Sequence, residues 1–250
     1  MPPGSPGKRA RHKGDHFMKA VILAAGRGTR MRGVFGDLPK ALIPLNNVPF
    51  LKYLFNNLHA AGITDIGIIV NYQKEKIAEF LASAKIPATL IRQPGTKGTG
   101  AAVASAEEFV GRRPFLVVSG DNLYSGRDLK RISSFRNAVG VVQHEEPQHF
   151  GVIKEQRGTL KEIVEKPQKF IGNKINTGLY SMTEKIFPYL KRLAPSPRGE
   201  IELTDAINQL AKKTEVAVVE LKDYFIDIGN PEQVKFAEAF IRRLQEEKCL

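Results

Sequence analysis

The chain has 250 residues, of which 42% are hydrophobic and 26% are charged, and this balance excludes wholesale disorder. No run approaches the ~20 apolar residues that a membrane-spanning helix needs. The one cysteine, Cys249, excludes a disulfide framework and a cysteine-rich zinc site. The net charge of +12 suits phosphorylated ligands or nucleic acid, but also general solubility.

Residues 1–17 differ in character from the rest of the chain. They are rich in proline, glycine and basic residues and show no hydrophobic period, so they are predicted to be a disordered basic leader. Such a leader is either a vector-derived segment or an upstream start, and without an apolar segment it is not a secretory signal. Residues 18–250 are predicted to form a single domain, and the lone thiol fits a reducing, cytoplasmic setting.

The first half of the folded region alternates apolar strands with helices. Short continuous apolar runs such as KAVILA are typical of strands that are buried on both faces. Repeated strand–helix units favour a Rossmann-like, mostly parallel open sheet with helices on both faces. The predicted strands lie at 19–24, 65–70, 88–92 and 114–119, and the predicted helices at 49–61, 74–84 and 99–110.

The second half has shorter strands and shorter connections. This pattern of short strands and short connections predicts a smaller mixed or antiparallel portion beside the parallel sheet, so the fold class is α/β. The predicted strands lie at 138–143, 151–155, 160–165, 215–219 and 224–228, and the predicted helices at 200–212 and 231–247.

A glycine-rich loop follows the first strand, with the sequence Ala25-Gly26-Arg27-Gly28-Thr29-Arg30. The carboxyl end of a strand is where open α/β sheets bind their ligands. Glycines let backbone N–H groups approach phosphate oxygens, and arginines add charge-assisted hydrogen bonds. The loop is neither a Walker loop nor a dinucleotide fingerprint, and a structural turn explains such a loop equally well.

Lys40, in Leu38-Pro39-Lys40-Ala41, lies ten residues after Arg30. With a GxGTR loop, a Pro-Lys at this distance and a helix beyond, the chain resembles the sugar-1-phosphate nucleotidylyltransferases, and in particular the thymidylyltransferases for glucose 1-phosphate. The resemblance extends from residue 18 to about residue 245. Gly33 and Phe35 depart from the family, which often has Pro and Thr there. The chain ends one helix after the last motif, so neither a C-terminal β-helix nor a second, acyltransferase activity is expected.

The resemblance implies a nucleotide-binding set on the first half of the chain. Gln93, Gly98 and Thr99 match the family's arrangement that reads the nucleotide base, and an amide side chain can donate to and accept from one base edge. The alternative for this stretch is a loop with a helix N-cap at Thr99. The full implied set is Ala25, Gly26, Gly28, Thr29, Gln93, Gly98 and Thr99.

Two aspartates far apart in the sequence each lie at a strand end. Asp121 follows a glycine after the strand at 114–119, and Asp227 lies in Phe225-Ile226-Asp227-Ile228-Gly229. Carboxylates in such places can hold Mg²⁺ against phosphate. For Asp121 the alternative is a cap on the next helix. The resemblance implies that both are Mg²⁺ ligands.

The remaining motifs are implied by the resemblance to bind the sugar phosphate. They are Gly151, Glu165, Lys166, Asn176 and Arg198. A bare glycine lets a sugar lie against the backbone, Glu165 would accept from sugar hydroxyls, and Lys166 would contact the phosphate. Surface charge for Arg198 and a turn role for Asn176 remain alternatives, and Glu202 and Asp205 are interpreted as helix-positioning residues.

The implied reaction transfers a nucleotidyl group from a nucleoside triphosphate to a sugar 1-phosphate, with dTTP or UTP and glucose 1-phosphate favoured. A phosphate oxygen of the sugar phosphate attacks in line and pyrophosphate leaves, with Arg30, Lys40 and Lys166 as the catalytic cations. The attacking oxygen is already anionic, so no general base or covalent intermediate is needed.

A membrane or nucleic-acid partner is not expected, and homo-oligomerisation is left open. The alternatives are a non-catalytic nucleotide-sugar sensor and a transferase for another phosphorylated acceptor, such as a phospho-polyol.

Overall fold

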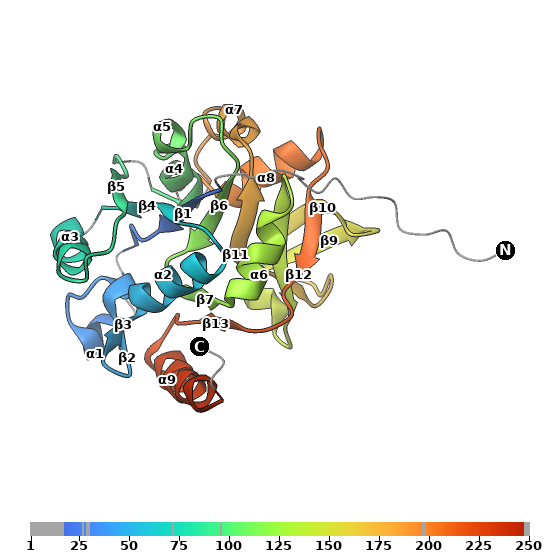
Figure 1. Ribbon diagram of the computed structural model, residues 1–250. Helices are drawn as coiled ribbons and strands as arrows, with labels where there is room; N and C mark the ends of the chain where they lie inside the picture. Colours follow the sequence, from blue (N-terminus) through green and yellow to red (C-terminus); the bar gives the residue numbers. More distant parts are fainter. Residues whose placement is uncertain are drawn as a thin grey trace.

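The computed structural model describes residues 18–26, 28, 31–71, 73–95, 97–196 and 199–247. The backbone of Arg32 is included but its side chain is not described. The leader predicted at 1–17 lies outside these ranges, as do the predicted site residues Thr29, Arg30 and Arg198. The described residues build a nine-stranded sheet with helices on both faces (Figure 1).

One half of this sheet is parallel. Its strands are β5 (Thr89–Arg92), β4 (Asp65–Val70), β1 (Lys19–Leu23) and β6 (Phe115–Ser119), in that order. The centre of β1 is fully buried because helices cover both sides of it. The apolar runs therefore predicted these strands to within a residue or two.

The other half is mixed and closes on itself. The strand β11 (Lys174–Met182) lies antiparallel to both β6 and β8 (Ala138–Gln143). Beyond β8 lie β12 (Ala217–Glu220), β10 (Thr159–Glu165) and β9 (Gly151–Gln156), and β9 returns to pair with β11 through Ile175 and Val152. The pairing β11–β8–β12–β10–β9 is thus a ring.

Two apolar cores lie on the two faces of the sheet. The first face is covered by α2 (Phe50–Ala60), α3 (Lys74–Ser83) and α6 (Gly126–Ser133), and α9 (Pro231–Glu246) joins the same core beside β13 and β2. The second face is covered by α4 (Thr99–Ala104), α5 (Glu107–Val110), α7 (Phe187–Leu190) and α8 (Leu203–Ala211). This is the layered α/β arrangement that the sequence predicted.

Smaller elements complete the fold. The strands β7 (Asn122–Tyr124) and β13 (Phe225–Asp227) form an antiparallel pair, as do β2 (Pro44–Leu45) and β3 (Val48–Pro49). The short helices are α1 (Arg32–Phe35) and the 3-10 turns η2 (Lys40–Leu42), η3 (Pro147–His149) and η4 (Glu184–Ile186). Among the described residues, no helix combines the length and apolarity that crossing a bilayer requires.

Two predicted helices are wrong in extent. The helix predicted at 99–110 is interrupted at Ser105, whose hydroxyl donates to the carbonyl of Ala102 at 2.6 Å and competes with the helical ladder. The helix predicted from residue 200 begins at Leu203, because the preceding residues are extended and Glu200 bridges to Lys97.

Candidate active site

A cavity of about 310 Å³ lies at the carboxyl ends of β1 and β6. Its wall comes from both halves of the sheet, including Leu23 of β1, Gly151 of β9 and Tyr180 of β11. The fold thus gathers at one place residues as far apart in the sequence as Leu23 and Asp227. Six of the sequence-predicted site residues line it: Thr99, Asp121, Gly151, Glu165, Asn176 and Asp227.

A larger cavity of about 710 Å³ lies elsewhere, beside β12 and the β9–β10 hairpin. It contains none of the predicted site residues. Its charged walls are largely paired with each other, since Lys174 Nζ lies 2.7 Å from Glu155 Oε1 and Lys222 Nζ lies 3.7 Å from Glu220 Oε2. We therefore take the smaller cavity as the candidate site.

The ends of β1 and β6 approach each other closely at this edge. Gly120 N donates to Leu23 O at 3.0 Å, and a Cβ on Gly120 would come within 2.4 Å of that same carbonyl oxygen. Only glycine therefore allows the segment that carries Asp121 to lie against the start of the loop at Ala25 and Gly26. Gly28, with φ of +56°, faces Lys40, because a Cβ there would lie 3.5 Å from Lys40 Cβ.

Lys40 reaches the cavity through an ion pair. It begins the turn η2, whose Ala41 and Leu42 are buried in the core and fix the backbone there. Its Nζ lies 2.6 Å from Asp121 Oδ2, and both side chains are partly exposed. Lys40, a predicted phosphate-binding cation, thus directly contacts Asp121, a predicted metal-binding carboxylate.

Asp121 and Asp227 lie on adjacent backbone segments. Asp227 pairs with Asn122 in the β7–β13 ladder, and Ile228 N donates to Asp121 O at 3.0 Å. Both aspartates line the same cavity. In the described part of the chain, no three His, Cys, Asp or Glu residues gather to hold an ion. Mg²⁺ commonly uses only one or two protein carboxylates, with phosphate and water as further ligands, so this donor pair fits it.

The predicted sugar side is formed by the paired ends of β9 and β10. Gly151 lies opposite Glu165, and a Cβ at Gly151 would come within 3.0 Å of Glu165 Oε1. The absent side chain therefore leaves room for that carboxylate at the cavity wall. Lys166, by contrast, is exposed and does not line the cavity. Its backbone is held in the left-handed region, with φ of +44° and its N–H donating to Phe150 O.

Asn176 organises a bulge in β11. The register against β8 shifts between Asn176 and Tyr180. Asn176 Nδ2 donates to the Tyr180 hydroxyl at 2.6 Å, and its Oδ1 accepts from Gly178 N at 3.1 Å. Gly178, at φ of +73°, would place a Cβ 2.3 Å from Ser119 Oγ. Burial raises the pKa of the Tyr180 phenol, so this group stays a protonated donor at neutral pH.

The predicted base-reading residues surround the start of α4. Gln93 is buried and its Nε2 donates to Gly98 O at 3.3 Å. Gly98, at φ of +107°, packs so closely on Ile201 that a Cβ would meet its carbonyl oxygen at 2.2 Å. Thr99 does act as a cap, but for another helix than expected, since its Oγ1 accepts from Leu203 N at the start of α8. Thr99 lines the cavity, whereas Gln93 and Gly98 do not.

Two buried polar atoms in the cavity wall have no hydrogen-bond partner among the residues that the structure describes. They are Asn122 Oδ1 and Thr204 Oγ1, on residues that are 9% and 6% exposed. An unsatisfied buried polar atom costs roughly 1–3 kcal/mol, which a bound ligand would offset. Neither residue could be predicted as a site residue from the sequence, because an Asn after Asp121 and a Thr in the first turn of a helix look like ordinary capping residues.

Comparisons with known proteins point to one family. The sequence profile of the family described as nucleotidyl transferase matches residues 19–243. A bifunctional sugar-1-phosphate nucleotidylyltransferase/acetyltransferase of Sulfurisphaera tokodaii is 36% identical over 217 residues, which cover 86% of this chain and 53% of that protein. The chain spans about half the length of such curated relatives.

Solved structures agree with this assignment. A UDP-glucose pyrophosphorylase complexed with UDP-glucose superposes with a TM-score of 0.81 at 26% identity, covering 91% of this chain and 99% of that one. A putative glucose-1-phosphate thymidylyltransferase from Bacillus anthracis, solved with a sucrose, gives a TM-score of 0.81 at 30% identity, covering 90% and 95%. The family resemblance and the α/β fold class predicted from the sequence are both confirmed.

Proposed function

This chain belongs to the nucleotidyl transferase family, and from that premise we propose that it transfers a nucleotidyl group from a nucleoside triphosphate to a sugar 1-phosphate. The products are a nucleotide-sugar and pyrophosphate. dTTP or UTP is the favoured donor and glucose 1-phosphate the favoured acceptor, in keeping with the two solved structures it resembles.

The observation that carries this proposal is the composition of one cavity. Asp121, which is paired with Lys40, lines this cavity together with Asp227, Glu165 and Asn176. Charged groups for phosphates and polar groups for hydroxyls therefore border one space. Such a space suits a phosphorylated sugar that meets a nucleotide.

The chemistry follows from bringing two polyanions together. A phosphate oxygen of the sugar 1-phosphate forms a new bond to the α-phosphorus, while the bond from that phosphorus to the leaving pyrophosphate oxygen breaks. The incoming oxygen carries its own negative charge, so this chain need not remove a proton. Its residues act mainly by positioning and by stabilising charge.

Each cation has a distinct task in this scheme. Lys40 exchanges Asp121 for the α-phosphate, Lys166 holds the sugar phosphate, and Arg30 holds the departing pyrophosphate. Asp121 and Asp227 would hold Mg²⁺, which when bound neutralises phosphate charge near the reacting phosphorus. Arg198 is proposed to add a further contact to the sugar phosphate.

The test is a matrix of four nucleoside triphosphates against several sugar 1-phosphates and one phospho-polyol, scored by pyrophosphate release. The expected result is turnover that is highest for dTTP or UTP with glucose 1-phosphate and that disappears with EDTA. Turnover only with the phospho-polyol would show that the acceptor is a phospho-polyol and not a sugar 1-phosphate. Nucleotide-sugar binding without pyrophosphate release in any combination would make the chain a sensor.

Thr204 offers a second prediction within this function. Thr204→Val removes the unpartnered hydroxyl while keeping the shape of the side chain. We expect an unchanged or slightly higher melting temperature, because no hydrogen bond to a described residue is lost, together with a KM for one of the two substrates raised by about three- to tenfold. Steady-state kinetics and thermal melting check the two effects.

Thr183 provides the matched control. It is equally buried, but its Oγ1 donates to Asn137 Oδ1 at 3.2 Å, away from the cavity. Thr183→Val is expected to lower the melting temperature and to leave the KM unchanged. If Thr204→Val left the KM of both substrates unchanged, this hydroxyl would contact neither of them.

A further inference from the structure

The strand that carries Asp227 is held by a short ladder. Within the described ranges, β13 pairs with β7 alone, through three residue pairs, and the two strands form a sheet of their own. An isolated two-stranded sheet is marginally stable at best. The distance between Asp227 and Asp121 therefore depends on what fixes the two ends of β13. One end is tied by Ile228 N to Asp121 O.

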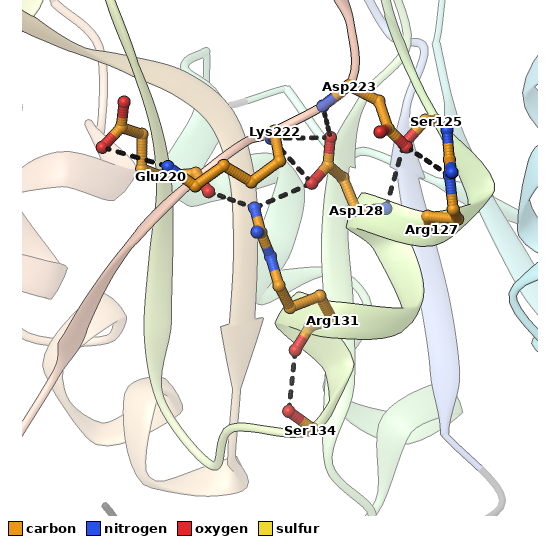
Figure 2. A network of polar contacts seen from close by, with 8 residues as sticks. All are labelled: Ser125, Arg127, Asp128, Arg131, Ser134, Glu220, Lys222 and Asp223. Atoms are coloured by element: carbon orange, nitrogen blue, oxygen red, sulfur yellow. Dashed lines mark hydrogen bonds and ion pairs between the residues drawn. The ribbon is translucent and has the colours of Figure 1, made fainter.

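The other end is tied to α6 by a buried carboxylate. Asp128 is 2% exposed, and its two oxygens accept from the backbone N–H groups of Lys222 and Asp223 at 3.0 to 3.1 Å. Arg131 Nη2 donates to the same carboxylate at 2.8 Å and also to the carbonyl of Glu220 (Figure 2). The turn that leads from β12 into β13 is thus bound at three backbone groups, with Lys222 N and Asp223 N held by Asp128 and Glu220 O held by Arg131.

A second attachment acts on the same turn. Asp223 Oδ2 accepts from Ser125 Oγ and from Arg127 Nε, each at 2.8 Å. Ser125 Oγ also accepts from Asp128 N, as the N-cap of α6 (Figure 2). α6 follows β7 directly, and β7 follows Asp121. Both aspartates are therefore attached to one continuous segment, residues 121–131.

We propose that Asp128 is a positioning residue that sets Asp227 opposite Asp121 by clamping residues 220–223 to α6. Asp128 does not line the active-site cavity, so it acts through the turn and not on substrate. The proposal rests on the proposed function in one respect, namely that the two aspartates share a metal ion. Burying a carboxylate is costly unless its partners are in place, and here those partners are the backbone of the turn.

The test compares Asp128→Asn with the wild-type chain. The amide keeps the shape of the side chain but presents an NH₂ group toward backbone donors. We expect faster hydrogen exchange at residues 222–228 and unchanged exchange in β4. We also expect Mn²⁺, titrated with and without dTTP and followed by EPR, to bind about 10- to 100-fold more weakly, with kcat reduced in the same range.

Two matched controls separate positioning from general destabilisation. Leu81→Ala opens the core under α3, far along the sheet from β13, and is expected to lower the melting temperature while leaving the Mn²⁺ affinity within twofold of wild type. Arg127→Ala removes an arginine that is 87% exposed from the same network and should also stay within twofold.

The outcomes distinguish this proposal from the proposed function. Mn²⁺ affinity within twofold of wild type in Asp128→Asn, or an equal loss in Leu81→Ala, overturns the positioning role. If the wild type turns over no substrate pair, the proposed function fails, yet the exchange and Mn²⁺ measurements still decide the role of Asp128. If Asp128→Asn does not fold, Ser125→Ala should show the same changes at about threefold, and no change there overturns the proposal.

Discussion

Replacing Asp121 by asparagine is expected to lower kcat by about 10²–10³, a range found when one preorganised electrostatic group is removed from an active site. The amide cannot supply a negative charge to a divalent ion, and it places an NH₂ group where Lys40 Nζ now finds a carboxylate oxygen at 2.6 Å. The side chain is 38% exposed, so the fold should tolerate the change. Pyrophosphate release over a range of Mg²⁺ concentrations measures the loss.

Asp65 supplies a control at the opposite edge of the same sheet. It begins β4, is 42% exposed, and its Oδ2 lies 3.3 Å from Lys19 Nζ. Asp65→Asn therefore removes an ion pair of similar exposure far from the cavity, and we expect less than a twofold change in kcat. If Asp121→Asn retained more than half of the wild-type turnover, the metal-binding role of this carboxylate would be wrong.

Lys40→Met should have an effect of comparable size, about 10²–10³ in kcat. Methionine keeps much of the aliphatic stem of lysine but cannot stabilise charge on the α-phosphate. The melting temperature should change little, because a partly exposed ion pair contributes only about 0–1 kcal/mol to stability. Single-turnover kinetics would separate a loss in the chemical step from a loss in nucleotide binding.

Lys154 is the matched control for this variant. Its Nζ lies 2.8 Å from Glu162 Oε2 on the exposed side of the β9–β10 hairpin, so it makes the same kind of contact outside the cavity. Lys154→Met is expected to stay within twofold of wild type. A Lys40→Met variant that also stayed within twofold would refute the proposed contact with the α-phosphate.

Much of the fold could be predicted because apolar runs report buried strands directly. The strands at 65–70 and 138–143 have the predicted bounds. The strand β11 was missed, since Asn176-Thr177-Gly178 interrupts its apolar pattern and looks like a turn. Its bulge is stabilised by distant partners, with Asn122 Nδ2 and the Tyr124 hydroxyl both donating to Thr177 O, and no local pattern encodes such contacts.

The candidate site could also be predicted in part. Motifs in a recognisable order identified residues that the fold brings to one cavity, such as Asp121, Glu165 and Asp227. Thr204 was not identified, because its importance lies in the lack of a partner in the folded chain. Asp128 was not identified either, because a carboxylate in an amphipathic helix is usually solvated, and only the turn before β13 makes it buried.

The ring of strands in the mixed half has a bearing on self-association. β9 returns to β11 through one residue pair, so β5 is the strand of the nine-stranded sheet that has a neighbour on one side only, among the described strands. Unpaired edges are templates on which chains add to one another and aggregate. β5 is only four residues long, and it ends in Arg92. A short edge that carries a charge recruits foreign strands poorly, so β5 is a weak template for intermolecular β-pairing.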